Sequence, residues 1–289
     1  MTAPRIDDYF VCVGAQKSGT TWLARILADH PELFLTPVKE IHYFDHVRGI
    51  TGHLSMEKRR SRYRKYHQRL WTEWGRFSRN RQHWRWYRDY MRPEIGDRWY
   101  ADLFRHRDGR RFAGEVTPEY AIIGREGFEH IRRLAPAARV LFIMRNPVER
   151  AWSQALHHAR SERIDAGRAS LEELKRIVDQ PRFRALGDYG ATLEAMSAVF
   201  PAEQSLAMFY EDIHKDRPAA LEAVCRFIGI RFDPALLGDT GRRFNKSQDA
   251  KLPAELRVHL AKCYKATAED VRRRLGRIPD AWAKEFGLP

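Results

Sequence analysis

The stretch Tyr9-Phe10-Val11-Cys12-Val13-Gly14-Ala15-Gln16-Lys17-Ser18-Gly19-Thr20-Thr21-Trp22 decides the fold of this chain. Its first five residues are apolar and predict a buried strand, and the apolar residues that follow it recur at helical spacing. Between the two lies a loop bounded by Gly14 and Gly19. A strand, a glycine loop and a helix in this order direct backbone N–H groups and a helix N-terminus at one point, which favours the binding of an anion.

The two glycines have the spacing of a nucleoside triphosphate loop, G-x-x-x-x-G-K-[ST], but the lysine of that pattern is missing. Thr20 stands in its place, and the lysine of the loop is Lys17. We therefore expect a phosphate-bearing ligand other than a magnesium triphosphate. The alternative is a plain glycine turn in which Thr20 or Thr21 caps the helix.

A second apolar run, residues 140–144, predicts a parallel strand buried on both faces, and it ends in Arg145. Pro147 then begins a helix, where its missing N–H costs nothing, and Ser153 follows two turns beyond Arg145. A cation at the carboxyl end of a strand in an open α/β sheet suits an anionic ligand. The alternative is a surface ion pair between Arg145 and Glu149.

The third informative segment is Lys39-Glu40-Ile41-His42-Tyr43-Phe44-Asp45. It follows Pro37 and predicts a short extended segment from Lys39 to Phe44. Because residues two apart on a strand share a face, Glu40 and His42 would point the same way. Either side chain can accept a proton from an incoming hydroxyl group. The alternative is a solvated carboxylate beside an imidazole at the edge of the core.

Taken together, these segments resemble those of the sulfotransferases. The run from Lys17 to Trp22 resembles the 5′-phosphosulfate loop of these enzymes, which use 3′-phosphoadenosine 5′-phosphosulfate (PAPS) and have a fold related to the nucleotide kinases. Residues 139–153 resemble the family's 3′-phosphate block, in which a buried strand ends in Arg-[Asn/Asp]-Pro and a serine follows. Residues 39–45 resemble the Golgi-type carbohydrate branch. The blocks and the strand–helix units between them cover most of the chain.

The resemblance implies a role for each matching residue. The 5′-phosphosulfate would be held by Lys17, Ser18, Gly19, Thr20, Thr21 and Trp22, and the 3′-phosphate by Arg145 and Ser153. Negative charge collects on the departing phosphate during sulfuryl transfer, and Lys17 would neutralise it. Glu40 would be the general base with His42 in reserve, and no metal is implied.

Two further blocks share the resemblance. Residues 112–120 resemble the family's Gly-Glu-[Lys]-[Ser/Thr]-Pro-x-Tyr segment on the acceptor side, with Val116 in place of the usual lysine. In the carbohydrate enzymes that lysine helps to hold the acceptor or the sulfuryl group, so its replacement puts a heparan-like acceptor in question. Residues 244–247 resemble the loop that closes over the cofactor. Lys246 in this loop would reach a phosphate, and Lys251 is the alternative.

The alternation of strand and helix patterns predicts an α/β fold, a three-layer sandwich with a mostly parallel central sheet. For 289 residues we expect a single domain, 1–289, rather than two independent ones. The remaining patterns predict a strand at 205–210, helices at 188–200, 217–227, 253–265 and 267–275, and a capping box from Ser170 to Glu173.

Residues 53–111 form a basic aromatic segment. It contains 18 Lys and Arg against 7 Asp and Glu, and so supplies +11 of the chain's net charge of +14. It also holds five of the eight tryptophans: Trp71, Trp74, Trp84, Trp86 and Trp99. Apolar residues at helical intervals predict an insertion of two or more amphipathic helices packed on one side of the sheet. Such a segment would either bind the acceptor by stacking and charge or only pack on the core.

The cysteines and the apolar runs bear on location. Cys12, Cys225 and Cys263 are far apart and lack the mutual spacing of metal ligands. This favours reduced thiols and a cytoplasmic setting. No stretch approaches 18 apolar residues and the first residues lack a signal-peptide core, so we expect no membrane span.

The sequence thus predicts a PAPS-dependent sulfotransferase that acts on a hydroxyl group of a carbohydrate or natural-product acceptor. One alternative is a small-molecule kinase of the same fold, for which Glu211 and Asp212 after a strand would bind magnesium. We expect a structural role for these two acids, because no lysine follows Gly19. The other alternative is a nucleic-acid-binding module, but no known nucleic-acid motif is present, and we expect no such partner.

Overall fold

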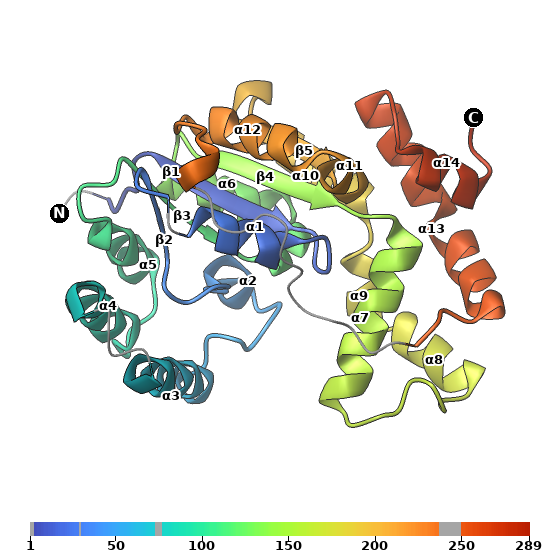
Figure 1. The fold of residues 1–289 in the computed structure, drawn as a ribbon, viewed down its shortest axis with the longest axis horizontal. Helices are drawn as coiled ribbons and strands as arrows, with labels where there is room; N and C mark the ends of the chain where they lie inside the picture. Colours follow the sequence, from blue (N-terminus) through green and yellow to red (C-terminus); the bar gives the residue numbers. More distant parts are fainter. Residues whose placement is uncertain (1–2, 29, 73–76, 237–249) are drawn as a thin grey trace.

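The computed structural model describes residues 3–28, 30–72, 77–236 and 250–289, with side chains outside residues 66–82. Its centre is a five-stranded sheet in the order β2-β3-β1-β4-β5, and all neighbouring strands are parallel (Figure 1). The strands are β1 (Tyr9–Gly14), β2 (Leu33–Leu35), β3 (Phe112–Val116), β4 (Arg139–Met144) and β5 (Ser205–Phe209). This confirms the predicted α/β class and the mostly parallel sheet.

Helices cover both faces of the sheet because its central strands are apolar throughout. Along β1, Val11 and Val13 enter one core cluster and Phe10 and Cys12 the other, as alternation on a strand requires. The helices α1 (Thr20–Leu27), α11 (Tyr210–Lys215) and α12 (Arg217–Ile228) contribute to the second cluster, and α6 (Gly124–Leu134), α7 (Pro147–Ser161) and α10 (Tyr189–Ser197) to the first. The result is the three-layer sandwich that the sequence predicts.

The strand order places two segments of the predicted site at one edge. β1 lies between β3 and β4, so the chain order reverses there and the carboxyl ends of β1 and β4 are neighbours. The N–H of Ala15, just after β1, donates to the carbonyl of Ile143 on β4 at 2.6 Å. Ligands of open α/β sheets bind at such a reversal. The glycine loop and Arg145 therefore meet at the position where this class of fold binds ligands.

The basic aromatic segment consists of α3 (Met56–Thr72), α4 (Phe77–Tyr90), α5 (Asp97–Leu103) and the 3₁₀ turn η1 (Phe104–His106), which lie together at one end of the molecule (Figure 1). Trp86 and Trp99 are buried in the first core cluster, whereas Trp84 is 46% exposed. Trp71 and Trp74 lie outside the described side chains. Packing on the core therefore explains two of the three described tryptophans, and an acceptor-binding role for the segment stays a prediction.

The C-terminal part forms one long helix where the sequence predicts two. α13 runs without a break from Ala254 to Leu275 and ends at Gly276, whose φ is +72°. The predicted division between residues 265 and 267 was wrong because no glycine or proline interrupts residues 254–275. α14 (Asp280–Phe286) follows. The capping box that opens α8 (Leu171–Val178) is confirmed: Ser170 and Glu173 bond reciprocally.

Short helical elements complete the chain: α2 (Tyr43–Val47), η2 (Pro118–Ile122), α9 (Pro181–Ala185), η3 (Ala202–Gln204) and η4 (Pro234–Leu236). Within the described ranges, no helix combines the length and the apolar character needed to cross a membrane. Cys12 and Cys225 are buried, Cys263 is partly buried, and all three are free thiols. The cytoplasmic setting stays a prediction.

Candidate active site

The glycine loop has the form of an anion site. Gly19 is the N-cap residue of α1 with φ +82°, and no described side chain caps this helix. Thr20 and Thr21 are its first two helical residues, so the alternative in which a threonine caps a plain turn was wrong. A side chain at position 19 would also meet the Tyr210 ring at 3.2 Å. Glycine is required here by both the backbone and the neighbour.

Ser18 is fully buried in the same loop, and its hydroxyl has no hydrogen-bond partner among the described residues. A buried polar atom without a partner is costly and calls for an explanation. The free backbone N–H groups at the start of α1 follow Ser18 directly in the chain. A phosphate bound against this helix end would accept hydrogen bonds from both, so the residues present fit a phosphate-bearing group.

Cations gather around this loop. The guanidinium of Arg145 donates to the carbonyl oxygen of Lys17 at 3.3 Å and lies 5.0 Å from the centre of the Tyr210 ring. Burial lowers the pKa of the Lys17 amine, and the charges of Arg145 and Lys39 lower it further, while the charge of Glu40 raises it. Cations that gather around one loop repel one another, and a bound anion relieves this repulsion. The loop therefore favours the binding of an anion.

The helix after β4 carries the rest of the predicted 3′-phosphate site. The side chain of Asn146 caps α7 by accepting from the N–H groups of Val148 and Glu149. Ser153 lies on α7, half-buried and one turn beyond Glu149. The ion pair of the alternative interpretation also exists: Arg145 approaches Glu149 at 3.8 Å. The same carboxylate is closer to Arg257 of α13, at 2.6 Å, so it is shared between two cations.

The acids after β5 bond to protein groups. Glu211 accepts from the backbone N–H of Asn146 at 2.8 Å and thereby fixes the turn that follows Arg145. Asp212 forms an ion pair with Arg277. These contacts agree with the structural role that we expect for both acids.

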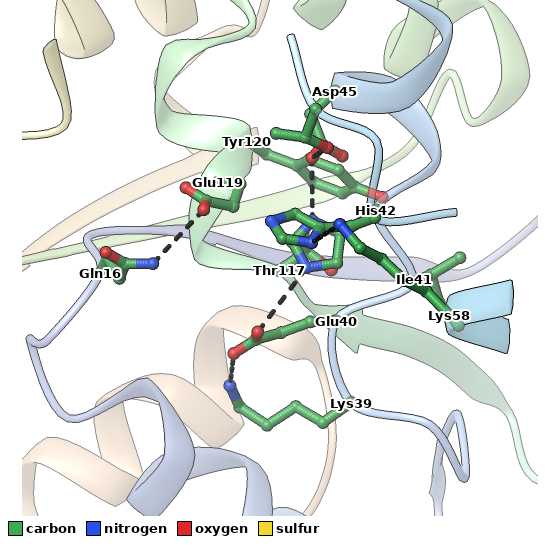
Figure 2. A network of polar contacts seen from close by, with 12 residues as sticks. Gln16, Lys39, Glu40, Ile41, His42, Asp45, Lys58, Thr117, Glu119 and Tyr120 are labelled. Carbon is green, nitrogen blue, oxygen red and sulfur yellow. Dashed lines mark hydrogen bonds and ion pairs between the residues drawn. The ribbon is translucent and has the colours of Figure 1, made fainter. Parts of the chain in front are cut away.

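The segment with the candidate bases does not have the predicted conformation. Glu40 and His42 have φ of +65° and +62°, and α2 begins at Tyr43, so the prediction of an extended segment was wrong. The two side chains nevertheless face each other, with Nε2 of His42 3.7 Å from Oε2 of Glu40 (Figure 2). The second oxygen of Glu40 pairs with Lys39. Tight local turns bring the two side chains together, whereas the sequence predicted that the alternation along a strand would do so.

Asp45 completes this group and was missed as a site residue. Its carboxylate is fully buried, lies 2.8 Å from Nδ1 of His42 and accepts the Thr51 hydroxyl at 2.5 Å. Burial alone would lower the pKa of His42, but Asp45 and Glu40 raise it to about 9. Burial would likewise raise the pKa of Glu40, but His42 and Lys39 lower it to about 2. The three-residue spacing from His42 to Asp45, at the start of a helix, was the available signal.

Glu115 on β3 is a second residue whose role the sequence did not indicate. It is fully buried and accepts from the N–H of Ile41 at 3.1 Å, between the two candidate bases. It also accepts hydrogen bonds from the hydroxyl groups of Tyr100, Tyr120 and Thr117. Burial raises the pKa of its carboxyl, and these hydrogen bonds oppose the rise. Glu115 therefore anchors the backbone that carries Glu40 and His42.

A cleft of about 440 Å³ opens beside Lys39. Its lining includes Thr21 and Arg25 of α1, Arg110, and Val116 at the end of β3. Val116, which stands where the acceptor-side block of the family usually has a lysine, thus lines the cleft. Lys246 lies outside the described residues. Lys251 is exposed and follows Ala250, whose carbonyl accepts from the Trp152 indole of α7 at 3.1 Å.

The model of the Sulfotransferase family matches residues 10–234, which include every block described above except the segment at 244–247. The chain belongs to the sulfotransferase family. This membership favours a sulfotransferase over the kinase and nucleic-acid-binding alternatives.

Among curated proteins, the chain is 23% identical over 313 residues to a bifunctional heparan sulfate N-deacetylase/N-sulfotransferase 2 of Bos taurus, covering 96% of this chain and 30% of the relative. It is 24% identical over 230 residues to the corresponding protein 1 of Mus musculus, covering 75% and 21%. The chain thus spans less than a third of the length of these relatives.

Among solved structures, a sulfotransferase from Alicyclobacillus acidocaldarius covers 98% of this chain and 99% of its own, with a TM-score of 0.65 and 23% identity. The sulfotransferase domain of the Synechococcus PCC 7002 olefin synthase gives a TM-score of 0.56 at 19% identity, covering 92% and 96%. At these identities the likeness concerns the fold, and it agrees with the parallel sheet described above.

Proposed function

We propose that this protein transfers the sulfuryl group of PAPS to a hydroxyl group of a carbohydrate or natural-product acceptor, with Glu40 as the general base. The observation that carries the proposal is the position of Glu40. Its carboxylate contacts His42 and Lys39, and its charge acts on Lys17 of the glycine loop. Sulfuryl transfer needs a base for the incoming hydroxyl beside cations for the departing phosphate, and this arrangement supports both.

PAPS, when bound, supplies an activated sulfuryl group, and 3′-phosphoadenosine 5′-phosphate (PAP) is the product. At the 5′ end, the residues that fit it are Lys17, Ser18, Gly19, Thr20, Thr21 and Trp22. The buried hydroxyl of Ser18 and the start of α1 support this part of the site. Arg145 and Ser153 would hold the 3′-phosphate, and Lys246 or Lys251 would approach a phosphate from the C-terminal side. No metal is needed, since cations and N–H groups neutralise the charge.

His42 and Asp45 would orient the base. With Asp45 at its Nδ1 atom, the imidazole directs Nε2 at Glu40. A His42 pKa of about 9 keeps this ring protonated at neutral pH, so that it donates to both carboxylates. A Glu40 pKa of about 2 keeps that group ionised, which a proton acceptor must be. His42 then carries a proton and cannot accept another, which supports Glu40 as the base.

The class of acceptor is tested directly by a transfer screen. The names of the mammalian relatives refer to heparan sulfate and to N-sulfation. Glycans with free amino groups therefore belong in the test beside hydroxyl acceptors. We propose a hydroxyl acceptor, and a cytoplasmic setting in which the free thiols stay reduced.

The experiment is a transfer assay with labelled PAPS across glycans, aminoglycans, glycolipids and phenols. Glu40→Gln should lower turnover by about 100-fold or more, because a positioned base contributes about that much. Glu269→Gln, at an exposed position on α13 outside the basic aromatic segment, is the matched control and should be silent. PAP should stabilise the wild type and Glu40→Gln equally against heat. Near wild-type turnover of Glu40→Gln would reject the base, and stabilisation by MgADP but not by PAP would reinstate the kinase alternative.

A further inference from the structure

Three potential metal ligands meet between α8 and α13, outside the candidate active site. Asp179 is the C-cap residue of α8. His259 and Cys263 lie four residues apart on α13, and this spacing places both on one face of the helix. The two helices are packed against each other. The group therefore joins residues that lie 80 positions apart in the chain, Asp179 and His259.

The ligand atoms converge closely. Nε2 of His259 is 2.9 Å from each oxygen of the Asp179 carboxylate and 3.8 Å from Sγ of Cys263. One atom from each of the three side chains lies within 4.8 Å of the others. Tetrahedral zinc with ligand bonds of about 2.0–2.3 Å separates neighbouring nitrogen and oxygen ligands by about 3.3 Å and nitrogen and sulfur by about 3.5 Å. The distances from Nε2 of His259 differ from these values by less than about half an ångström, and the Asp179 oxygen and the Cys263 sulfur, which lie within 4.8 Å of each other, would approach to about 3.5 Å.

The same nitrogen faces both partners, which distinguishes this group from a proton relay. In a Cys–His–Asp relay the acid holds one ring nitrogen and the thiol uses the other. Here Nε2 of His259 faces the Asp179 carboxylate and the Cys263 sulfur at once. A carboxylate oxygen, an imidazole nitrogen and a thiol sulfur around one point suit a bound metal cation.

We propose that Asp179, His259 and Cys263 bind a zinc ion. A thiolate and an imidazole favour zinc over the oxygen-seeking ions magnesium and calcium. The Cys263 thiol would release its proton to solvent, and the neutral imidazole would carry its one proton on Nδ1, which leaves Nε2 free for the ion. The thiolate and the carboxylate would then balance the two charges of the ion. Three protein ligands leave one coordination position for water. The side chains of His259 and Asp179 are 28% and 41% exposed, so an ion can enter from solvent.

The ion would fasten α13 to α8 close to the candidate active site. Arg257, two residues before His259 on α13, holds the Glu149 carboxylate that also approaches Arg145. The zinc site would thus stabilise the helix that supports this side of the anion site. It lies outside the catalytic group and does not rest on the proposed function.

The test is metal binding by the full chain after treatment with a chelator. We expect one zinc ion per chain by competition with a chromophoric chelator, and a rise in melting temperature that follows from binding to the folded state. Cobalt in the same site should give a thiolate-to-metal charge-transfer absorption. Cys263→Ser should abolish that absorption and the stabilisation, and His259→Gln and Asp179→Asn should each weaken zinc binding more than about tenfold.

Cys225→Ala is the matched control, because it removes a buried thiol on α12 and should leave the cobalt absorption intact. Circular dichroism of each variant shows whether it is folded before metal is added. The proposal is overturned if folded wild type binds no zinc at micromolar concentration. It is also overturned if Cys263→Ser keeps the cobalt absorption and the wild-type affinity.

Discussion

At the scale of single residues, Glu115 anchors the candidate base through the backbone. Its carboxylate accepts the Ile41 N–H and three hydroxyl groups, all in the core. Glu115→Gln replaces one carboxylate oxygen by an amide NH₂ group, which cannot accept the hydrogen bonds made at that oxygen. We expect the free energy of unfolding to fall on the order of 2 kcal/mol, the cost of a disrupted buried network. Turnover should fall as well, with unchanged affinity for PAP, because Glu40 would be displaced.

Chemical denaturation, turnover and calorimetry with PAP measure these three effects. Thr117→Val removes one of the four bonds to Glu115 with little change of shape and serves as the milder comparison. If Glu115→Gln lost stability but kept full turnover, the carboxylate would be structural only.

His42 gives stability a defined pH dependence. Its pKa is raised from 6.5 to about 9 in the folded protein. The resulting stabilisation is fully present below pH 6.5 and is lost as pH rises through about 9. We therefore expect the difference in unfolding free energy between wild type and His42→Asn to shrink, on the order of 2 kcal/mol, over this window. Denaturant titrations of both proteins across it measure the difference, and a constant difference would contradict the raised pKa.

At the scale of elements, α13 supports α7 through one shared carboxylate. Arg257 of α13 lies 2.6 Å from Glu149, which also approaches Arg145 at 3.8 Å. In Arg257→Ala, Glu149 would pair with Arg145 alone and compete with a 3′-phosphate. We expect PAP binding to weaken about fivefold or more, a modest coupling energy. Calorimetry gives the affinity.

Glu149→Gln in the Arg257→Ala background should restore PAP binding, because the competing charge is gone. Arg226→Ala on α12 removes an exposed pair with Glu222 and is the matched control. Failure of the double variant to recover affinity would show that Arg257 acts only through packing.

Elements with strong local signals could be predicted, and those set by tertiary contacts could not. The apolar run of β1 and the glycines around the loop fixed strand, loop and helix, and Pro147 marked the start of α7. The conformation of residues 39–42 could not be predicted from periodicity, because Glu40 and His42 adopt a left-handed backbone that few non-glycine residues adopt. The bond from Ile41 to Glu115, 74 residues away, helps to hold this backbone and depends on the folded chain.

At the scale of the whole molecule, the net charge of +14 and the cations of the loop should draw in an anionic nucleotide. We expect the association rate of PAP to fall several-fold as salt rises from low to physiological ionic strength, because exposed charges are screened beyond the Debye length. Stopped-flow binding measures this rate. Adenosine, which has no charge, is the control ligand, and equal salt dependence for both would contradict electrostatic steering.

The sequence predicted the layers of the molecule but not the order of its strands. Alternating patterns indicated a mostly parallel sheet, whereas the order β2-β3-β1-β4-β5 depends on contacts between distant segments. The sites, like the strand order, depend on contacts between distant segments that the sequence does not reveal. Lys17 and Arg145 were predicted from their blocks, but the shared carboxylate of Glu149 and the cluster at Cys263 join segments that only the fold brings together.

Calorimetry with PAP and with adenosine 5′-phosphate tests the central claim most directly, because the two ligands differ only in the 3′-phosphate. The wild type should bind PAP more than about tenfold tighter, the value of one charge-assisted contact. Arg145→Ala should lose most of this preference, whereas binding of adenosine 5′-phosphate should weaken much less, because the guanidinium contacts the glycine loop only at the Lys17 carbonyl. A wild type without preference for PAP, or an Arg145→Ala variant that keeps it, would contradict a nucleotide site built from the glycine loop and Arg145.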